Sequence, residues 1–267
     1  MTNSPSSIGI FDSGFGGLTV LRALIDELPF ENFIYFGDTA RLPYGNKSAD
    51  TIRNYARENS SFLLKSQIKL LVIACHTACS YALEELSSTL SIPVIGVIPP
   101  SIDELARLKQ NKRIAILGTR GTIASGVYQE KIAGLLPETE IFAIPCPLFV
   151  PLVEEGYTEH LLTKLAVQEY LNPLKEKNLD AALLGCTHYP LLQQTIKGEL
   201  GDQVVLIDPG VSCAKETRKI LIEKDLVNKQ TTFGEVQFFV SDDPEKFQKL
   251  GKNFLNQKIK NVFLINS

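Results

Sequence analysis

The sequence predicts an α/β fold made of two similar lobes, each a mostly parallel sheet flanked by helices. Short runs rich in Ile, Val and Leu alternate with longer runs of helical periodicity along the chain. Strands that alternate with helices in this way are typical of parallel sheets covered on both faces. The alternation starts afresh near residue 113, and 267 residues suit one large or two small α/β domains.

Apolar runs of strand length, bounded by turn-forming Gly, Pro, Asn or Asp, mark the expected strands. They lie at residues 7–12, 32–38, 69–75, 93–99, 113–119, 140–146, 180–186, 204–210 and 236–242. Helical periodicity and capping residues between them mark the expected helices. These lie at residues 18–29, 48–66, 77–90, 123–136, 160–177, 191–200 and 211–224, with one more near the C-terminus. Pro99 and Pro100 are interpreted as the punctuation that closes the first run.

The two halves repeat one plan. Each has an early strand followed by a turn of small residues, "FDSGFGG" in the first half and "LGTRGTIASG" in the second. Each also has a later strand that ends in a small residue and a cysteine, "IAC" and "LGC". We therefore predict a first lobe of residues 1–97 plus 209–267 and a second lobe of residues 98–208, with the active site in the cleft between them.

Composition excludes several classes of protein. A hydrophobic content of 44%, a charged content of 21% and a net charge of −3 are ordinary for a globular protein and do not indicate direct nucleic-acid binding. No apolar run is long enough for a membrane span, and the N-terminal residues lack the pattern of a secretory signal. Five cysteines at scattered spacings then predict reduced thiols and a cytoplasmic protein.

Polar motifs follow two strands of the first half. Asp12 and Ser13 come directly after a strand, and the glycines behind them let backbone N–H groups approach an anion at a helix start. This motif lacks the Lys-Ser/Thr of a P-loop and the spacing of a dinucleotide-binding turn. The alternative is a plain tight turn with a capping Asp. The loop "FGDTARLPYGNKS", with Tyr44 and Gly45 at its tip, is by itself also compatible with a surface turn.

Two cysteines, Cys75 and Cys186, end buried strands of the two halves. His76 and Thr77 follow Cys75, and Thr187 and His188 follow Cys186. Ligands of parallel α/β sheets bind beyond the carboxyl ends of the strands, which is where both thiols fall. A helix N-terminus stabilises a thiolate, and His188 could exchange protons with its neighbouring cysteine.

Three chemistries suit two thiols that share a pocket. Metal binding is disfavoured, because zinc sites usually take ligands at knuckle-type spacings that these strand ends do not offer. A single nucleophilic cysteine would leave the other thiol without a use. The third is acid–base work on two faces of a carbon: one thiolate removes a proton and the opposite thiol returns one. This third reaction inverts a stereocentre and requires no cofactor and no metal.

Four segments resemble glutamate racemases of the aspartate/glutamate racemase superfamily: "IGIFDSGFGGLTVLRAL", "FGDTARLPYG", "CPLFVPLVEEG" and "LLGCTHYPLL". The resemblance covers nearly the whole chain, including the late "FFVSDDPEKF". It implies two α/β lobes with the site between them, and a cofactor-independent interconversion of L- and D-glutamate that supplies bacterial peptidoglycan synthesis. It also suggests a homodimer.

The same resemblance implies the roles of individual residues. Cys75 and Cys186 would be the two catalytic acid/bases, assisted by Asp12, His188 and a glutamate for which we take Glu154 over Glu155. The substrate would be held by Asp12, Ser13, Tyr44, Gly45, His76, Thr77, Thr187 and His188. Cys79, Cys146 and Cys213 are interpreted as packing thiols, and His160 as a surface or capping residue.

One residue departs from the family pattern. Where the pattern reads Cys-Asn-Thr, this chain reads Cys75-His76-Thr77. Imidazole offers one donor and one acceptor in a larger, planar ring. The change either replaces the hydrogen bonds of the amide with little effect or shifts the specificity. Two alternatives therefore stay open: a racemase or epimerase of aspartate or diaminopimelate, and a weakly active scaffold with a binding role such as gyrase inhibition.

Overall fold

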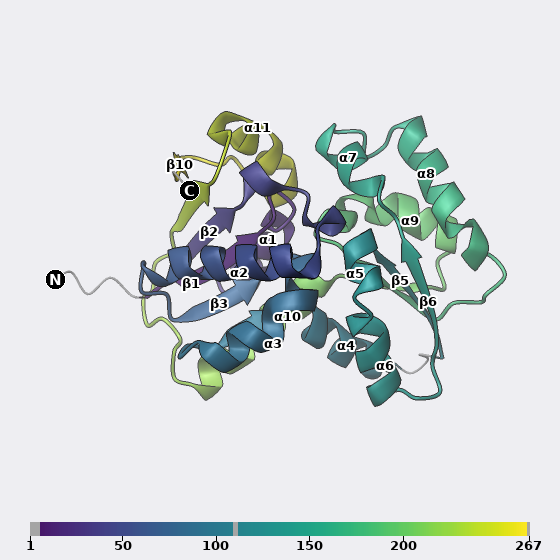
Figure 1. Ribbon diagram of the computed structural model, residues 1–267, viewed down its shortest axis with the longest axis horizontal. Coiled ribbons are helices and arrows are strands. Elements are labelled where there is room, and N and C mark those ends of the chain that lie inside the picture. Colours follow the sequence, from purple (N-terminus) through teal and green to yellow (C-terminus); the bar gives the residue numbers. More distant parts are fainter. Residues whose placement is uncertain (1–5, 109–111, 266–267) are drawn as a thin grey trace.

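The computed structural model describes residues 6–108 and 112–265. These residues form two parallel sheets, and Figure 1 shows them as two lobes that lie side by side with helices around each sheet. The predicted α/β class with two mostly parallel sheets is confirmed. No helix in the described part of the chain is long and apolar enough to cross a membrane.

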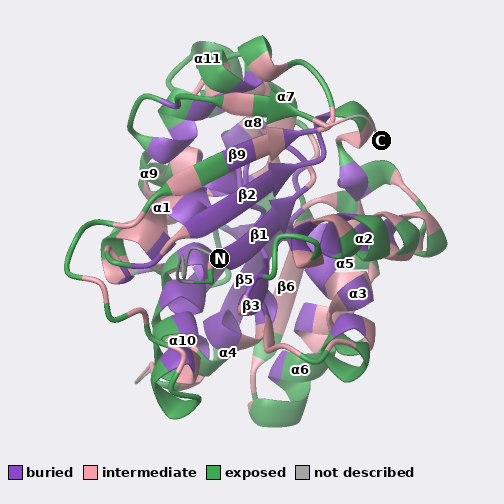
Figure 2. Cartoon of the chain, turned by 90° about the vertical axis from the view of Figure 1, so that its left-hand side faces the viewer, coloured by how far each residue is buried: buried purple, intermediate pink, exposed green. Residues whose placement is uncertain are grey.

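The sheet of the first lobe has six parallel strands in the order β10-β9-β2-β1-β3-β4. They are β1 (Ile8–Asp12), β2 (Phe33–Gly37), β3 (Leu70–Ile73), β4 (Val94–Gly96), β9 (Val236–Val240) and β10 (Val262–Leu264). Every residue of β1, β2 and β3 is buried, and Figure 2 shows these strands in the middle of the lobe. This burial on both faces explains why their sequences are continuous apolar runs.

The sheet of the second lobe has four parallel strands in the order β6-β5-β7-β8. They are β5 (Arg113–Gly118), β6 (Glu140–Pro145), β7 (Ala181–Gly185) and β8 (Val205–Ile207). All strands of the first sheet lie within residues 1–97 and 209–267, and all strands of the second sheet lie within residues 98–208, which are the ranges of the predicted lobes. The boundaries themselves stay a prediction.

Helices connect the strands and cover the sheets. The first lobe carries α1 (Leu18–Glu27), α2 (Ala49–Leu64), α3 (His76–Thr89), α10 (Pro209–Glu223) and α11 (Pro244–Leu255). The second carries α4 (Ile98–Ala106), α5 (Arg120–Ala124), α6 (Val127–Leu135), α7 (Phe149–Glu154), α8 (Leu161–Leu171) and α9 (Gln193–Leu200). The chain crosses between the lobes just before α4 and just before α10, and these two helices pack against each other. The lobes are therefore joined by two neighbouring crossings.

Two local predictions were wrong and two short elements were not predicted, each for a physical reason. Pro99 and Pro100 do not end the pattern but sit in the first turn of α4, where proline is well accommodated. The helix predicted at residues 123–136 is broken into α5 and α6 by Gly126, whose φ of 72° only glycine adopts freely. The short α7 and β10 were not predicted, because six and three residues show too little periodicity.

The carboxyl ends of the central strands face the other lobe. In the first lobe β1 ends at Asp12, level with Gly37, and β3 is followed by Ala74 and Cys75. In the second lobe Gly118 and Gly185 are paired at the ends of β5 and β7, and Cys186 follows. The fold therefore brings the polar motifs of both halves to one cleft, at the edge where parallel sheets bind ligands.

Candidate active site

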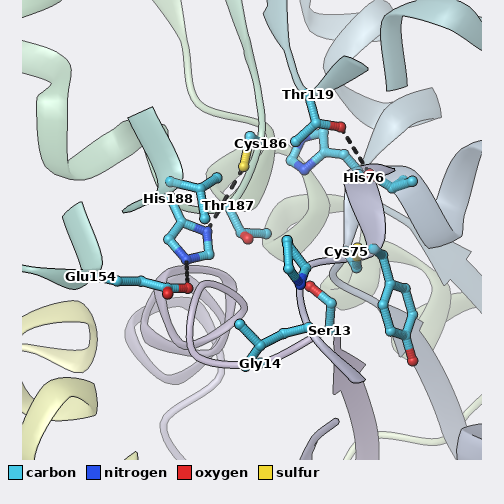
Figure 3. A pocket seen from close by; sticks show the side chains of 15 residues that line it. Ser13, Gly14, Cys75, His76, Thr119, Glu154, Cys186, Thr187 and His188 are labelled. Atoms are coloured by element: carbon cyan, nitrogen blue, oxygen red, sulfur yellow. Dashed lines mark hydrogen bonds and ion pairs between the residues drawn. The ribbon is translucent and has the colours of Figure 1, made fainter. Parts of the chain in front are cut away.

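A small cavity lies between the lobes (Figure 3). The predicted site residues that line it are Ser13, Tyr44, Gly45, Cys75, His76, Thr77, Glu154, Cys186, Thr187 and His188. Its volume of about 30 Å³ holds about two water molecules. The described residues thus form a nearly closed cleft around both cysteines.

Cys75 directly precedes α3, at the N-cap position. Its side chain caps the helix, because the backbone N–H of Ala78 points at the sulfur from 3.5 Å. Burial, and after it the neighbouring Asp12 carboxylate, nevertheless raise the pKa of the thiol to about 12. Hydrogen bonds from Ala78 and Ser13 only partly oppose this rise. The helix N-terminus does lower the pKa of this thiol, as predicted, but desolvation raises the pKa by more, so the thiol form is favoured in the closed cleft.

Cys186 lies in the opposite wall and heads a chain of side chains. Its sulfur is 3.8 Å from His188 Nδ1, and His188 Nε2 is 3.1 Å from Glu154 Oε1. Burial raises the pKa of this thiol well above its usual value, and the backbone N–H of His188 opposes the rise. Glu154 is in the site and Glu155 is exposed, so the geometry favours the predicted choice between them. The sulfur, imidazole and carboxylate can pass a proton along one line.

Asp12 is placed differently from the prediction, because it is not among the residues that line the cavity. It is fully buried, and its Oδ2 accepts a hydrogen bond from Gly14 N–H at 2.9 Å. Thr187 of the other lobe approaches Oδ1 at 3.5 Å. Burial raises the pKa of Asp12, while the charge of His188 and the N–H groups of the glycine-rich turn lower it. In the closed cleft Asp12 therefore supports the turn and the lobe contact, and does not face the cavity.

The glycines of the same turn lie so close to neighbouring side chains that a Cβ atom would not fit. A Cβ on Gly16 would meet Thr187 Oγ1 and lie 2.5 Å from His188 Nδ1. A Cβ on Gly17 would lie 2.8 Å from the hydroxyl of Tyr35 and against Asp12. The turn thus lets the lobes meet with almost no gap, which a plain tight turn would not need.

The Tyr44 loop is stabilised by hydrogen bonds to residues that lie outside the cavity. The Tyr44 hydroxyl donates to Asp38 and accepts from Asn59 Nδ2 at 3.0 Å. Asp38 in turn accepts from Arg41 Nε at 2.7 Å and from Ser241 at 2.9 Å. The hydroxyl is therefore already engaged outside the cavity, and Tyr44 offers the cavity its ring and backbone. Tyr44 is 1% exposed and lines the cavity, so the alternative interpretation of this loop as a surface turn is wrong.

Three threonine hydroxyls join the lobes beside the cavity. Thr77 of α3 lies 3.0 Å from Thr119 and 3.1 Å from Thr122 of the second lobe, and these two are 3.0 Å apart. On the other side, Thr19 donates to the carbonyl of Thr187 at 2.9 Å. The cleft is thus closed by direct hydrogen bonds between the lobes.

His76 is the least satisfied polar residue of the site. It is 3% exposed, and neither ring nitrogen has a hydrogen-bond partner among the described residues. The ring packs against Tyr128 of the second lobe, with centroids 6.4 Å apart. Burial lowers the pKa of His76 to about 3, so the ring is neutral at physiological pH. It offers the cavity one donor and one acceptor.

The remaining predicted residues are placed as expected. Cys79, Cys146 and Cys213 are buried and free, and His160 caps α8 through a hydrogen bond from Leu162 N–H at 3.2 Å. Within residues 6–108 and 112–265, no group of three or more His, Cys, Asp or Glu side chains is arranged to hold a metal ion.

Gly14 lines the cavity and belongs to the glycine-rich turn that was predicted to approach a ligand. Sequence reasoning gave no site role to four other lining residues: Leu42, Pro43, Thr119 and Val150. Thr119 had a signal, because it follows the early strand of the second half as Ser13 follows that of the first. Leu42 and Pro43 belong to the loop whose tip was predicted. Val150 had none, since α7 itself was not predicted.

Comparison with known proteins places the chain among racemases. The family model of Asp/Glu/hydantoin racemases matches residues 27–217. The glutamate racemase of Geobacter metallireducens is 46% identical over 259 residues, which cover 97% of this chain and 96% of that protein.

Solved structures agree with this comparison. The crystal structure of glutamate racemase from Francisella tularensis in complex with D-glutamate matches with a TM-score of 0.92 and 37% identity, covering 98% of this chain and 97% of that chain. A glutamate racemase isoform from Bacillus anthracis matches with a TM-score of 0.94 and 34% identity over the same shares of the two chains.

Proposed function

The chain belongs to the Asp/Glu/hydantoin racemase family, and on that premise we propose that it interconverts L- and D-glutamate by a two-cysteine, two-base reaction without a cofactor. One observation carries the mechanism: two buried thiols, Cys75 and Cys186, line one cavity from opposite lobes. The D-glutamate bound in the similar Francisella structure supports the choice of substrate.

The reaction needs a base on one face of the α-carbon and an acid on the other. The thiolate of one cysteine takes the α-proton, and the electron pair of the broken C–H bond stays on the substrate as a carbanion delocalised into the α-carboxylate. The thiol of the other cysteine then donates its proton to the opposite face. Each turnover exchanges the protonation states of the two sulfurs, so the enzyme is ready for the opposite enantiomer.

The raised pKa values of both thiols must be overcome when substrate binds. The substrate ammonium brings a positive charge into the cavity, and a nearby positive charge favours a thiolate. Cys186 also has a route for its proton, through His188 to the side of Glu154. Positioned proton transfer typically contributes about 10²–10⁴-fold for a group of this kind. Electrostatic stabilisation of the carbanion in a dry cleft supplies the rest.

Binding is assigned to the polar groups that face the cavity. The hydroxyls of Ser13, Thr77, Thr119 and Thr187 suit the carboxylates of the substrate, as does the N-terminus of the long helix α3. His76 can accept from the ammonium or donate to a carboxylate. Because the closed cavity holds only about two waters, the lobes must open for substrate and close around it.

We also propose a role in the cell, a location and an oligomeric state for this protein. The bacterial origin of the relatives supports a role in supplying D-glutamate for peptidoglycan synthesis. A location in the cytoplasm is part of the proposal and is supported by the five free cysteines. A homodimer rests on the family resemblance alone.

The test is proton NMR of the purified protein in D2O, with no cofactor added, on L-glutamate, D-glutamate, aspartate and diaminopimelate. Loss of the α-proton signal of glutamate, with appearance of the opposite enantiomer, is the expected result. Exchange with another amino acid alone would move the assignment to a sister specificity and point to His76. A protein that exchanges none of them would contradict the proposal and favour a binding role.

A further inference from the structure

A second pocket adjoins the cavity on its outer side. We call it the outer pocket; it shares Leu42, Pro43, Gly45, Thr119, Val150 and Glu154 with the cavity. It adds Asn46, Arg120, Pro147 and Pro151. Its volume is about 230 Å³, against about 30 Å³ for the cavity. The two spaces are therefore neighbours of very different size, divided by residues that line both.

This difference in size sets the order of binding. The cavity as it stands cannot admit an amino acid, whereas the outer pocket can. A substrate can therefore enter the outer pocket of the closed protein before it reaches the cysteines. Transfer to the cysteines follows when Thr119 and its neighbours separate from the first lobe.

The outer pocket carries one free positive charge. Arg120 is exposed, lies directly after Thr119, and has no ion pair or side-chain hydrogen bond among residues 6–108 and 112–265. The other charged residue of the lining is Glu154, whose carboxylate is already directed at His188, 3.1 Å away. An incoming anion thus meets an unpaired guanidinium, while the nearest carboxylate is engaged with an imidazole.

We propose that the outer pocket is a docking site for the carboxylates of the incoming substrate, with Arg120 as its cation. The inference rests on the proposed function, because it takes an acidic amino acid as the ligand. The protein carries a net charge of −3 and glutamate is an anion, so their long-range interaction is repulsive. Arg120 offsets this repulsion at the entrance through its positive charge. Its charge acts on capture of the substrate and not on proton transfer.

The test combines steady-state kinetics with a direct measurement of association. The variants are R120Q, R120E and R120K, and the matched control is K164Q, which removes the same charge from a groove of the second lobe away from the cleft. Racemisation of glutamate gives kcat and KM in both directions. Stopped-flow tyrosine fluorescence gives the association rate, since the chain has eight tyrosines and no tryptophan.

At low salt we expect R120Q to lower kcat/KM and the association rate about fivefold, and R120E to lower both further. We expect R120K and K164Q to stay within about twofold of the unmodified protein, and kcat to stay within about twofold in all variants. The losses should shrink at about 0.5 M salt, where screening is strong.

Several results would overturn the docking role. One is that R120E leaves both kcat/KM and the association rate within about twofold. Another is that K164Q loses as much as R120Q, which would make the effect one of total charge. A third is a fall in kcat alone. Failure of the unmodified protein to racemise glutamate would instead count against the proposed function, and is seen before any variant is made.

Discussion

The imidazole of His188 is fixed by Glu154, whose Oε1 lies 3.1 Å from Nε2. This contact leaves Nδ1 for Cys186, 3.8 Å away, so the second sulfur is backed by an imidazole and a carboxylate in series. Among the described residues, no imidazole contacts Cys75 in this way; its neighbours are Asp12, Ser13 and the start of α3. The two thiols therefore have chemically unequal surroundings.

Replacing either cysteine by serine should abolish racemisation. A serine hydroxyl is a far weaker acid than a thiol, so the face that it serves would lose its proton donor and acceptor. C75S and C186S should each lose at least about 10³-fold in kcat/KM, measured by circular dichroism of glutamate in both directions. Near-normal activity of either variant would exclude the two-base assignment, and C213S, which changes a buried thiol outside the cavity, serves as the control.

Loss of the His188 imidazole should slow the proton transfer at Cys186 and leave the proton transfer at Cys75 unchanged. H188N should lower kcat/KM by about 10²-fold. L- and D-glutamate are equal in free energy, so the fall in kcat/KM must be the same in both directions. The asymmetry should appear in the α-deuterium isotope effect, which should increase only for the enantiomer whose proton Cys186 removes. An equal isotope effect for both enantiomers would show that His188 serves both sulfurs.

The two adjacent glutamates should behave differently. E154Q removes the charge that faces His188 Nε2, and a hydrogen bond to a charged group is worth about 1.5–3 kcal/mol. Its kcat should fall about 10- to 100-fold with little change in KM. E155Q changes an exposed side chain and is the control. Equal losses in the two variants would remove Glu154 from the chain of side chains.

An added methyl group at Gly16 should hold the lobes apart. G16A places a Cβ against Thr187 and His188, so the cleft cannot close as it does here. We expect at least about 100-fold loss of kcat/KM, because displacement of a positioned group by about 1 Å costs this much. G134A is the control, since its Cβ meets nothing within 4 Å and should stabilise α6 by up to about 1 kcal/mol. Urea denaturation checks that G16A is folded, and full activity of that variant would contradict the close approach.

His76 should make the protein sensitive to acid. Its pKa is about 3 in the folded chain and about 6.5 when unfolded, so the unfolded chain binds the extra proton between these values. Stability is therefore present above pH 6.5 and is lost as the pH falls towards 3. Between pH 7 and pH 5 this loss is about 2 kcal/mol. Urea denaturation of H76F should show a loss smaller by this amount; an identical pH dependence would mean that His76 is protonated in the folded protein.

Much of the fold and of the site could be predicted because apolar runs mark buried strands. Cys75 and Cys186 were found because each ends such a run, and parallel strands bring their ends to one edge. The start of α6 (Val127–Leu135) was missed because the single residue Gly126 sets it. The start of α4 was missed because Pro99 and Pro100 lie in its first turn. Hydrophobic periodicity carries no information about either feature. The contact of the buried Asp12 with Thr187 of the other lobe joins residues 175 positions apart, and no local pattern encodes it.

The interrupted path of the first lobe has a consequence for synthesis. A ribosome makes β1 to β4 first, then the whole second lobe, and only afterwards β9, which pairs with β2. Until then the edge of β2 has no neighbour on that side. Phe254 of α11, whose ring meets His188 edge-on, is made later still. The nascent chain therefore carries Cys75 and Cys186 well before Phe254 can pack against His188, so the surroundings of His188 are completed only after α11 has been made.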